Sequence, residues 1–537
     1  MSALLDPGRL LWRNHGGLHL PEHKTLSNQR PTRPISASTC KELVVPLLQH
    51  AGMHPDILVK VGESINKGQP LAKSQGYASL PIHASTSGLI RAIEKRPIPH
   101  PSGLEDTCII IEPDGADHWG AHKLEPLPHY AELDGVTLRS RICFAGIVGL
   151  GGAVFPAAIK LNVRPKMPIS TLIINGAECE PYITCDDLLM REKPEEIIAG
   201  AQVILHILLS HTPPEGQECL IGIEDNKPEA IQAMQAAVKA SGDQRIHIVP
   251  IPTLYPSGGE KQLIKILTGR EVASGSRPTD SGVICHNVAT ARAIYRAVVW
   301  GEPLISRYIT VTGGGVAEAQ NFEVPFGVPI RTLIEQAGGY TDKAERLIMG
   351  GPMMGISLAN DSIPVVKASN CILVEQAANK PAAQPCIRCG ACAAACPVTL
   401  LPQQLYWHAR AKHFEEIEKY HLFDCIECGC CAYVCPSHLP LVDYYRFAKS
   451  EIRHQRQVQH KADVARERHE FRLERLERAK REKAEKLAKH KQALQNKSAT
   501  KGDDAKQAAI QAALERAKAK KEKAQQTPLT PTEDKSA

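Results

Sequence analysis

Two runs of cysteine near the carboxyl-terminal third of the chain have the residue type and spacing most suited to redox chemistry. Each run has the pattern Cys-x2-Cys-x2-Cys-x3-Cys-Pro. The eight cysteines are Cys386, Cys389, Cys392, Cys396, Cys425, Cys428, Cys431 and Cys435. A tight loop supplies three thiolates to an iron–sulfur cubane, and the fourth comes from a separate turn. The spacing therefore predicts two [4Fe–4S] clusters and leaves Cys430 spare.

The pattern resembles that of bacterial two-cluster ferredoxins, in which the fourth cysteine of each run ligates the cluster of the other run. The resemblance implies that Cys435 completes the first cluster and Cys396 the second. Gly390 and Gly429 directly follow the second cysteine of each run, which suits a backbone that curls around sulfides. A zinc ribbon or a pair of disulfides does not require two triple-cysteine loops that each end in Cys-Pro, so both are disfavoured.

Length and composition place the chain among multidomain proteins. Its 537 residues exceed what one hydrophobic core usually supports, so three or more domains are expected. Seventeen cysteines, together with an amino-terminal segment that lacks an apolar signal core, favour a reducing, cytosolic compartment. No apolar run reaches about eighteen residues, so a membrane role would be peripheral.

Charge is distributed unevenly. Residues 451–537 hold 23 Lys/Arg and 14 Asp/Glu, a net +9, whereas the remaining residues hold 41 and 44, a net −3. The basic character belongs to the tail alone, which argues against nucleic-acid binding by the folded body.

Residues 55–115 have short apolar runs separated by glycine turns, which predicts a small all-β unit. This pattern resembles the barrel-sandwich fold of lipoyl and biotinyl domains. A carrier domain needs a lysine at the hairpin tip, but the equivalent bend is Gln75-Gly76-Tyr77-Ala78. A structural version of the fold is therefore expected.

Residues 138–300 alternate between helical and buried-strand patterns, which predicts an α/β unit. A glycine-rich stretch, Gly146–Pro156, precedes Lys160, and the strand pattern Thr171–Ile174 ends in Asn175. Glycines where a strand or loop meets a helix let backbone N–H groups approach a phosphate. Polar residues at a strand's carboxyl end lie where α/β folds bind ligands. Alone, the glycine cluster also fits a tight turn.

Four motifs occur in the order found in the FMN- and NADH-binding flavoprotein subunit of complex I. They are Gly149-x-Gly151-Gly152-Ala153-x-Phe155-Pro156, Asn175-x-x-Glu178-x-Glu180-Pro181, Gly258-x-Glu260 and Asn287-Val288-x-Thr290. With the barrel-sandwich pattern before them and the cysteine runs after them, residues 12–450 resemble the family of C subunits of Rnf (Rsx) ion-translocating electron-transport complexes.

This resemblance implies roles for eleven residues. The cradle of the FMN phosphate and ribityl chain would be Gly149, Gly151, Gly152, Lys160 and Asn175, closed by Asn287 and Thr290. Phe155 and the catalytic Glu180 would meet the nicotinamide and ribose, beside Glu178 and a second catalytic residue, Glu260. The chain departs from the complex I motifs at four positions: Val154 stands for a glycine, Ala177 for an aspartate, Gly259 for a glutamate and His286 for an asparagine.

The remaining segments have less specific patterns. Residues 307–358 contain a strand, glycine turns and a helix at 330–337, and resemble the soluble-ligand-binding β-grasp domain of the same families. Residues 401–421 are expected to form an amphipathic helix over the clusters. After Ser450 the chain is rich in Ala, Lys, Glu and Arg, which predicts two solvated helices, broken at 496–504, and a disordered end at 527–537.

The expected architecture is multidomain α/β. It comprises an amino-terminal segment and barrel-sandwich domain at 1–130, a Rossmann-like FMN/NADH-binding domain at 131–305, a β-grasp domain at 306–365, a helical two-cluster ferredoxin domain at 366–450, and a helical and disordered tail at 451–537.

The resemblance implies a translocase subunit of the NADH:ferredoxin oxidoreductase type, with FMN, two [4Fe–4S] clusters and NAD(H) as substrate. It would lie peripherally on the cytoplasmic face of the inner membrane and contact other subunits or ferredoxin. The tail would be a solubilising tether, or would contact anionic lipid or an acidic partner. Two alternatives stay open: a soluble reductase, such as a cobalamin reductase, and a ferredoxin relay that is not catalytic.

Overall fold

The computed structural model describes residues 10–121, 123–164, 167–210, 212–377, 381–498 and 504–524. The chain divides into two compact units, Met1–Lys449 and Ser450–Ala537. Within the described residues, the strands form four sheets, all of them in the first unit. Among the described helices, none combines the length and the apolar character needed to cross a bilayer.

Two small antiparallel sheets form the all-β unit. One has the order β2-β8-β7-β4, with β2 at Leu43–Pro46, β4 at Ser64–Ile65, β7 at Gly88–Pro97 and β8 at Glu105–Pro113. The other contains β3 at Asp56–Ile57, β5 at Pro70–Lys73 and β6 at Ile82–His83. Ile109 and Ile111 of β8 belong to the main hydrophobic core, whereas Ile110 belongs to a separate cluster, as the alternation of a strand requires. The all-β expectation for 55–115 is confirmed, although β2 lies before that range.

A four-stranded parallel sheet forms the centre of the α/β unit. Its order is β11-β10-β9-β12, with β9 at Thr171–Gly176, β10 at Glu218–Glu224, β11 at Ile246–Ile251 and β12 at Val283–Asn287. The chain adds β10 and β11 on one side of β9 and then returns to add β12 on the other side. This change of direction creates a switch point between β9 and β12, where ligands bind in open α/β sheets. Asn175 and Asn287 are register partners at the carboxyl ends of these two strands.

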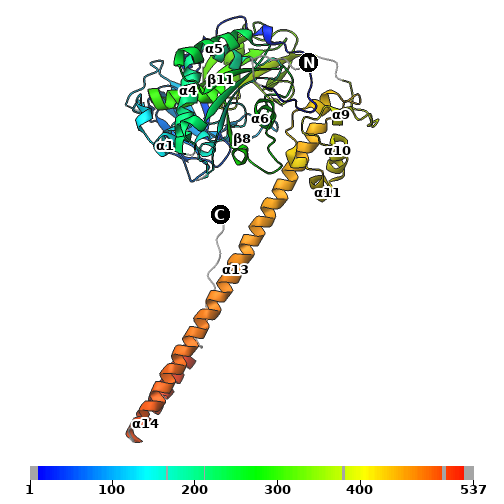
Figure 1. Ribbon diagram of the computed structural model, residues 1–537. Coiled ribbons are helices and arrows are strands. Elements are labelled where there is room, and N and C mark those ends of the chain that lie inside the picture. Colours follow the sequence, from blue (N-terminus) through cyan, green and yellow to red (C-terminus); the bar gives the residue numbers. More distant parts are fainter. Residues whose placement is uncertain are drawn as a thin grey trace. The chain divides into compact units, whose positions relative to one another are not determined.

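Helices cover both faces of this sheet (Figure 1). The helices α3 (Cys185–Glu192), α4 (Pro194–Ile207), α5 (Pro228–Ser241) and α7 (Val288–Tyr295) share the main core with Leu172 and Ile174 of β9. The opposite face holds α6 (Glu260–Thr268), which packs with Ile173 of β9. Two further helices, α1 (Gly135–Phe144) and α2 (Ala157–Lys160), flank the glycine-rich stretch.

A six-stranded mixed sheet follows, with the order β1-β14-β13-β17-β15-β16. Its strands are β1 at Arg33–Pro34, β13 at Ser306–Thr312, β14 at Gln320–Pro325, β15 at Ala344–Met349, β16 at Ile356–Ser357 and β17 at Cys371–Gln376. The predicted helix is present as α8, Ile330–Gln336. Strand β17 lies beyond residue 365 and enters between β13 and β15, while β1 comes from the amino-terminal segment.

Short helices surround the cysteine runs: α9 (Ala391–Ala394), α10 (Pro402–Ala411), α11 (Phe414–Lys419) and α12 (Cys430–Tyr433). The single helix expected over 401–421 is wrong in detail. Lys412 adopts a φ of 57°, which ends α10 and separates it from α11.

The helix α13, Leu441–Ser498, begins in the first unit and supplies most of the second, together with α14, Asp504–Ala524 (Figure 1). Described side chains of the second unit are nearly all exposed, which confirms the prediction of solvated helices. Residues 499–503, within the predicted break, and the end predicted to be disordered lie outside the described residues.

Candidate redox site

The glycine-rich stretch forms a small closed loop whose tip is exposed. The Gly149 amide donates to the Phe155 carbonyl at 2.8 Å, and the Val154 amide donates to the Gly149 carbonyl at 3.2 Å. Within the described residues, the amides of Gly151, Gly152 and Ala153 have no hydrogen-bond acceptor. Gly152 has a φ of 112°, which favours glycine. Gly151 and Gly152 have no side chains, and successive free amides form a concavity that can bind an anion. This loop therefore fits a flavin phosphate.

Asn287 and Thr290 lie against this loop. The Thr290 hydroxyl accepts a hydrogen bond from the Leu150 amide at 2.8 Å, and a Cβ on Gly151 would lie 3.3 Å from the Asn287 Cβ. Asn287 caps α7 by accepting from the Ala289 amide at 2.9 Å. Its side-chain amide donates to Asp186 at 2.6 Å. The structure thus brings these residues together, and their polar atoms order the loop and helix.

Lys160 and Glu260 meet at the start of α6. Their side chains form an ion pair at 2.6 Å and are both partly exposed. Nearby, Asn175 accepts from the Ala177 amide at 3.1 Å and donates to the Gly258 carbonyl at 2.8 Å. Lys160 is therefore already paired with a carboxylate in this structure.

His286 lies buried beside this pair, where the complex I motif has an asparagine. Burial, assisted by the Lys160 cation, lowers the pKa of His286 to about 3. Its Nε2 has no hydrogen-bond partner in the described part of the chain. The imidazole is therefore neutral at physiological pH.

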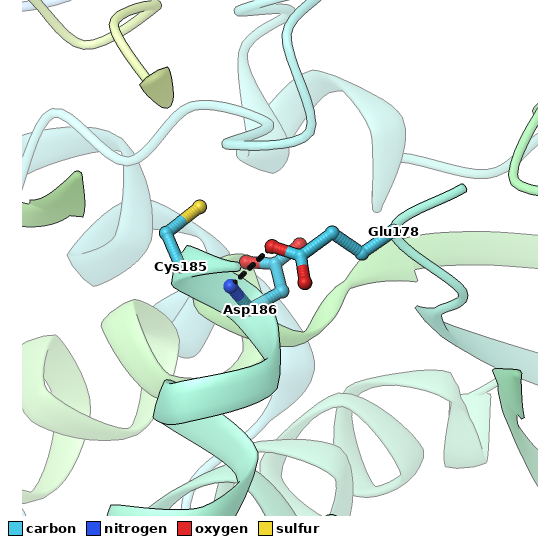
Figure 2. A group of neighbouring side chains, drawn as sticks. All are labelled: Glu178, Cys185 and Asp186. Carbon is cyan, nitrogen blue, oxygen red and sulfur yellow. Dashed lines mark hydrogen bonds between the residues drawn. The ribbon is translucent and has the colours of Figure 1, made fainter. Parts of the chain in front are cut away.

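Glu178 is half-buried beside the start of α3, and its carboxylate accepts from the Asp186 amide at 2.6 Å (Figure 2) and from the Asp187 amide at 3.1 Å. Burial raises the pKa of Glu178 to about 8; Lys24 opposes this shift and Asp186 adds to it. Ligand atoms of Glu178, Cys185 and Asp186 lie within 4.8 Å of one another. Because backbone amides already donate to both carboxylate oxygens of Glu178, this residue acts in this structure as a cap for α3.

Two buried lysines that the sequence did not single out hold the backbone of the Asn175–Pro181 motif. Lys24 Nζ donates to the carbonyls of Glu178 at 2.6 Å, Glu180 at 3.0 Å and Ile183 at 2.8 Å. Lys227 Nζ donates to the Ala177 carbonyl at 2.8 Å. Both side chains are isolated in sequence from the motif, so no spacing signal identified them.

The carboxylate of Glu180 faces the 349–355 loop. It accepts from the amides of Met353 at 2.7 Å and Met354 at 2.9 Å, and a Cβ on Gly351 would lie 2.1 Å from its Cγ. Burial raises the pKa of Glu180 despite the two amides. Phe155, in contrast, is 44% exposed on the glycine loop. Glu180 and Phe155 were both expected at the nicotinamide. The Glu180 carboxylate is bound by two backbone amides, whereas the Phe155 ring is exposed.

One small cavity brings the last cysteine of the first run to the first three of the second. It is lined by Cys396, Cys425, Cys428 and Cys431, with apolar walls from residues such as Leu405. Burial raises the pKa of Cys431, and the neighbouring sulfurs raise it further. Four converging thiols suit an iron–sulfur cluster, whose iron ions stabilise thiolates.

The segment directly before Cys386 lies beside the turn that follows Cys435. The Gln384 amide donates to the Ser437 carbonyl at 2.8 Å, and the Ser437 hydroxyl donates to the Pro385 carbonyl at 2.9 Å. These bonds join the segment before Cys386 to the segment after Cys435. This contact and the cavity around Cys396 support crossed ligation, which stays a prediction for both runs.

Tyr255 connects the α/β unit to the second run. Its hydroxyl donates to the Cys428 carbonyl at 2.6 Å, and its backbone pairs with Leu18. The amino-terminal segment also contacts this region, since the Gly17 amide donates to the Ala395 carbonyl at 3.1 Å. The α/β unit, which holds the glycine-rich loop, is therefore joined to the cysteine runs by direct contacts.

Comparisons with protein families divide the chain in the order seen in the structure. Family models match for an RnfC barrel sandwich hybrid domain at residues 12–116, a Nuo51 FMN-binding domain at 142–296, an SLBB domain at 308–357 and a 4Fe-4S dicluster domain at 385–439. These matches confirm the barrel-sandwich unit and support FMN and iron–sulfur clusters as cofactors.

Curated relatives are similar over most of the chain. The C subunit of an ion-translocating oxidoreductase complex from Pseudomonas aeruginosa is 48% identical over 86% of this chain and 58% of its own length. The protein of the same name from Haemophilus influenzae strain 86-028NP is 46% identical over 95% of this chain and 75% of its own length. The chain thus spans less than two-thirds of the Pseudomonas relative. A solved chain from an NAD+-reducing [NiFe]-hydrogenase in the H2-reduced state is 18% identical, with a TM-score of 0.41, over 61% of this chain and 63% of its own.

Proposed function

Since this chain belongs to the family of C subunits of ion-translocating oxidoreductase complexes, we propose that it is a peripheral electron-transfer subunit of such a complex. It exchanges electrons with NADH or ferredoxin and relays them to partner subunits, where ion movement across the membrane is coupled. The observation that carries this proposal is the contact, through Tyr255, between the unit with the free-amide loop and the cysteine cavity.

In the proposed site, the amides of Gly151, Gly152 and Ala153 bind the FMN phosphate, and Lys160, which pairs with Glu260 in this structure, is the cation assigned to it. Gly149 and Thr290 hold the backbone of this loop, Asn287 lies against it, and Asn175 holds the Gly258 carbonyl at the neighbouring strand end. When bound, FMN accepts an electron pair from NADH and releases single electrons, which is what clusters accept. The eight cysteines of the two runs hold two [4Fe–4S] clusters by crossed ligation.

The nicotinamide nucleotide lies over Phe155 and Glu260 in this proposal. Both side chains are partly exposed next to the loop or to Lys160, which supports contact with a diffusible substrate. Glu178 and Glu180 are half-buried and already accept hydrogen bonds from backbone amides. We assign them to positioning the strand-end motif, with Glu180 also bordering the 349–355 loop.

The proposed domains are the amino-terminal and barrel-sandwich domain at 1–130, the FMN/NADH domain at 131–305, a β-grasp domain at 306–365, the ferredoxin domain at 366–450 and the tail at 451–537. The proposed location is peripheral, on the cytoplasmic face of the inner membrane. The basic tail helices serve as a tether or contact anionic lipid or an acidic partner.

Cofactor content and turnover of the purified, reconstituted full chain test this function. We expect about one FMN and about eight irons per chain, with NADH-dependent reduction of ferricyanide. Glu260→Gln is expected to raise KM for NADH while leaving cofactor content unchanged. Clusters without flavin would contradict the flavoenzyme and favour a ferredoxin relay. Reduction of a corrinoid by the isolated chain would favour the soluble reductase.

A further inference from the structure

The segment that follows the α/β unit places two buried basic side chains against the glycine-rich stretch. Arg307 lies on β13 and is 3% exposed; Lys367 precedes β17 and is 2% exposed. Arg307 donates through Nη2 to the Leu150 carbonyl at 3.1 Å and through Nη1 to the Lys367 carbonyl. Lys367 Nζ donates to the Gly146 carbonyl at 2.7 Å. Both side chains therefore donate to main-chain oxygens of the 146–150 stretch, and Arg307 also donates to the Lys367 backbone.

These bonds fix the direction of one peptide group. In a trans peptide, the carbonyl of one residue and the N–H of the next point in opposite directions. Because Arg307 holds the Leu150 carbonyl in the interior, the Gly151 N–H points away from Arg307, toward the exposed tip. Thr290 holds the other side of Leu150 by accepting from its amide at 2.8 Å. Leu150 is thus anchored through both of its peptide groups.

We propose that Arg307, supported by Lys367, is a positioning residue that presents the Gly151 amide to the flavin phosphate. This inference rests on the proposed FMN site and extends it to a residue outside the FMN-binding domain match. Arg307 directly precedes the SLBB match at 308–357 and Lys367 follows it, so the inference links the chain around that match to the glycine loop. The fixed positive charge of Arg307 also favours an anion above the loop.

Flavin affinity measured with and without the phosphate tests this role. The flavin-depleted full chain is titrated with FMN and, separately, with riboflavin, and binding is followed by quenching of flavin fluorescence. In Arg307→Lys the charge remains but the guanidinium fork is lost, so we expect FMN to bind about tenfold more weakly. Riboflavin affinity is expected to change less than about twofold, because riboflavin lacks the group that the Gly151 amide binds.

The matched control is Arg292→Lys. Arg292 is also a buried arginine, at 7% exposed, but it pairs with Glu196 and Glu323 instead of the loop. This variant is expected to keep the wild-type ratio of FMN to riboflavin affinity. If Arg307→Lys loses cluster absorbance and so fails to fold, Lys367→Gln takes its place, with a smaller loss of FMN affinity in the same direction.

Equal weakening of FMN and riboflavin binding in the variant would overturn the inference, because it would indicate a general structural role. An unchanged ratio in a variant that retains its cluster absorbance would also overturn it. Failure of the proposed function is distinguishable: in that case the wild-type chain itself would bind no FMN, or would bind FMN no better than riboflavin.

Discussion

The loops 386–389 and 425–428 have the same backbone and very different surroundings. Arg388 and Glu427 occupy equivalent positions, and both have a φ of 59°. In each loop the amide of this residue donates to the sulfur of the first cysteine at 3.4 Å. The following glycines, Gly390 and Gly429, have φ values of 80° and 82°. The two loops therefore have the same local backbone geometry.

What covers the loops differs. In the first, Ile387 is 68% exposed and Cys389 is exposed. In the second, Ile426 packs with Tyr255, and Cys428 is buried. The comparison shows that residues outside the cysteine pattern decide which of the two cysteine loops is buried against the α/β unit. Under the proposed function, the second-run cluster is expected to exchange electrons with the flavin, and the first-run cluster with a partner.

The largest effect is expected from Cys396→Ser. Because Cys396 shares a cavity with Cys425, Cys428 and Cys431, its loss should remove the cluster of the second run and spare the first. About half of the iron should be lost, and one of two electron paramagnetic resonance signals should disappear. Cys435→Ser is the matched variant and should remove the other signal. Loss of the same signal in both variants would disprove crossed ligation.

Chelation should separate the two clusters by rate. The surroundings of a metal site control solvent access, and Cys389 is exposed whereas Cys428 is buried. Incubation of the oxidised protein with a chelator should therefore remove the first-run cluster about tenfold faster than the second. The signals identified in the cysteine variants report each loss separately. Equal rates would mean that loop exposure does not govern access.

Local features of the chain could be predicted from the sequence, whereas the residues that surround the two cysteine runs could not. The ligand spacing, the strand at 171–174 and the helix α5 at Pro228–Ser241 follow from local patterns, so they were accessible from the sequence. The helix at 401–421 was predicted as one element because a left-handed lysine at 412 has no sequence signature.

Long-range contacts were inaccessible for a different reason. Lys24, Arg307 and Tyr255 act on loops far away in sequence, and a lone lysine, arginine or tyrosine carries no periodicity or spacing. The same limit applies to Glu180, whose motif implied a nicotinamide contact, while the fold placed its carboxylate under the amides of 353 and 354.

Tyr255→Phe tests the inward orientation of the second cluster. Removal of the hydroxyl leaves the Cys428 carbonyl without this donor, so the reduced, more negative cluster should be less stable. The midpoint potential of the second-run signal should fall in a redox titration, while that of the first-run signal stays constant. Electron transfer from flavin to that cluster should slow by a few-fold. A shift of the first-run signal instead would reverse the proposed order of the clusters.

The smallest effect is expected at the equivalent pair Glu427 and Arg388. Glu427 accepts from Lys449 at 2.8 Å and from Arg446 at 3.0 Å, and these ion pairs hold the second loop against the start of α13. The Lys449 side chain is only 6% exposed, so Glu427→Gln weakens a charge-assisted bond at a largely desolvated amine. We expect a loss of about 1–2 kcal/mol in the free energy of unfolding.

Arg388→Gln is the control, since Arg388 is exposed and should contribute less than about 0.5 kcal/mol. Urea denaturation followed by cluster absorbance measures both variants under anaerobic conditions. Comparable losses in the two would mean that the loops are equally anchored. A loss confined to Glu427→Gln would tie the buried character of the second loop to its two cations, because the two positions share one backbone conformation and differ in charge partners.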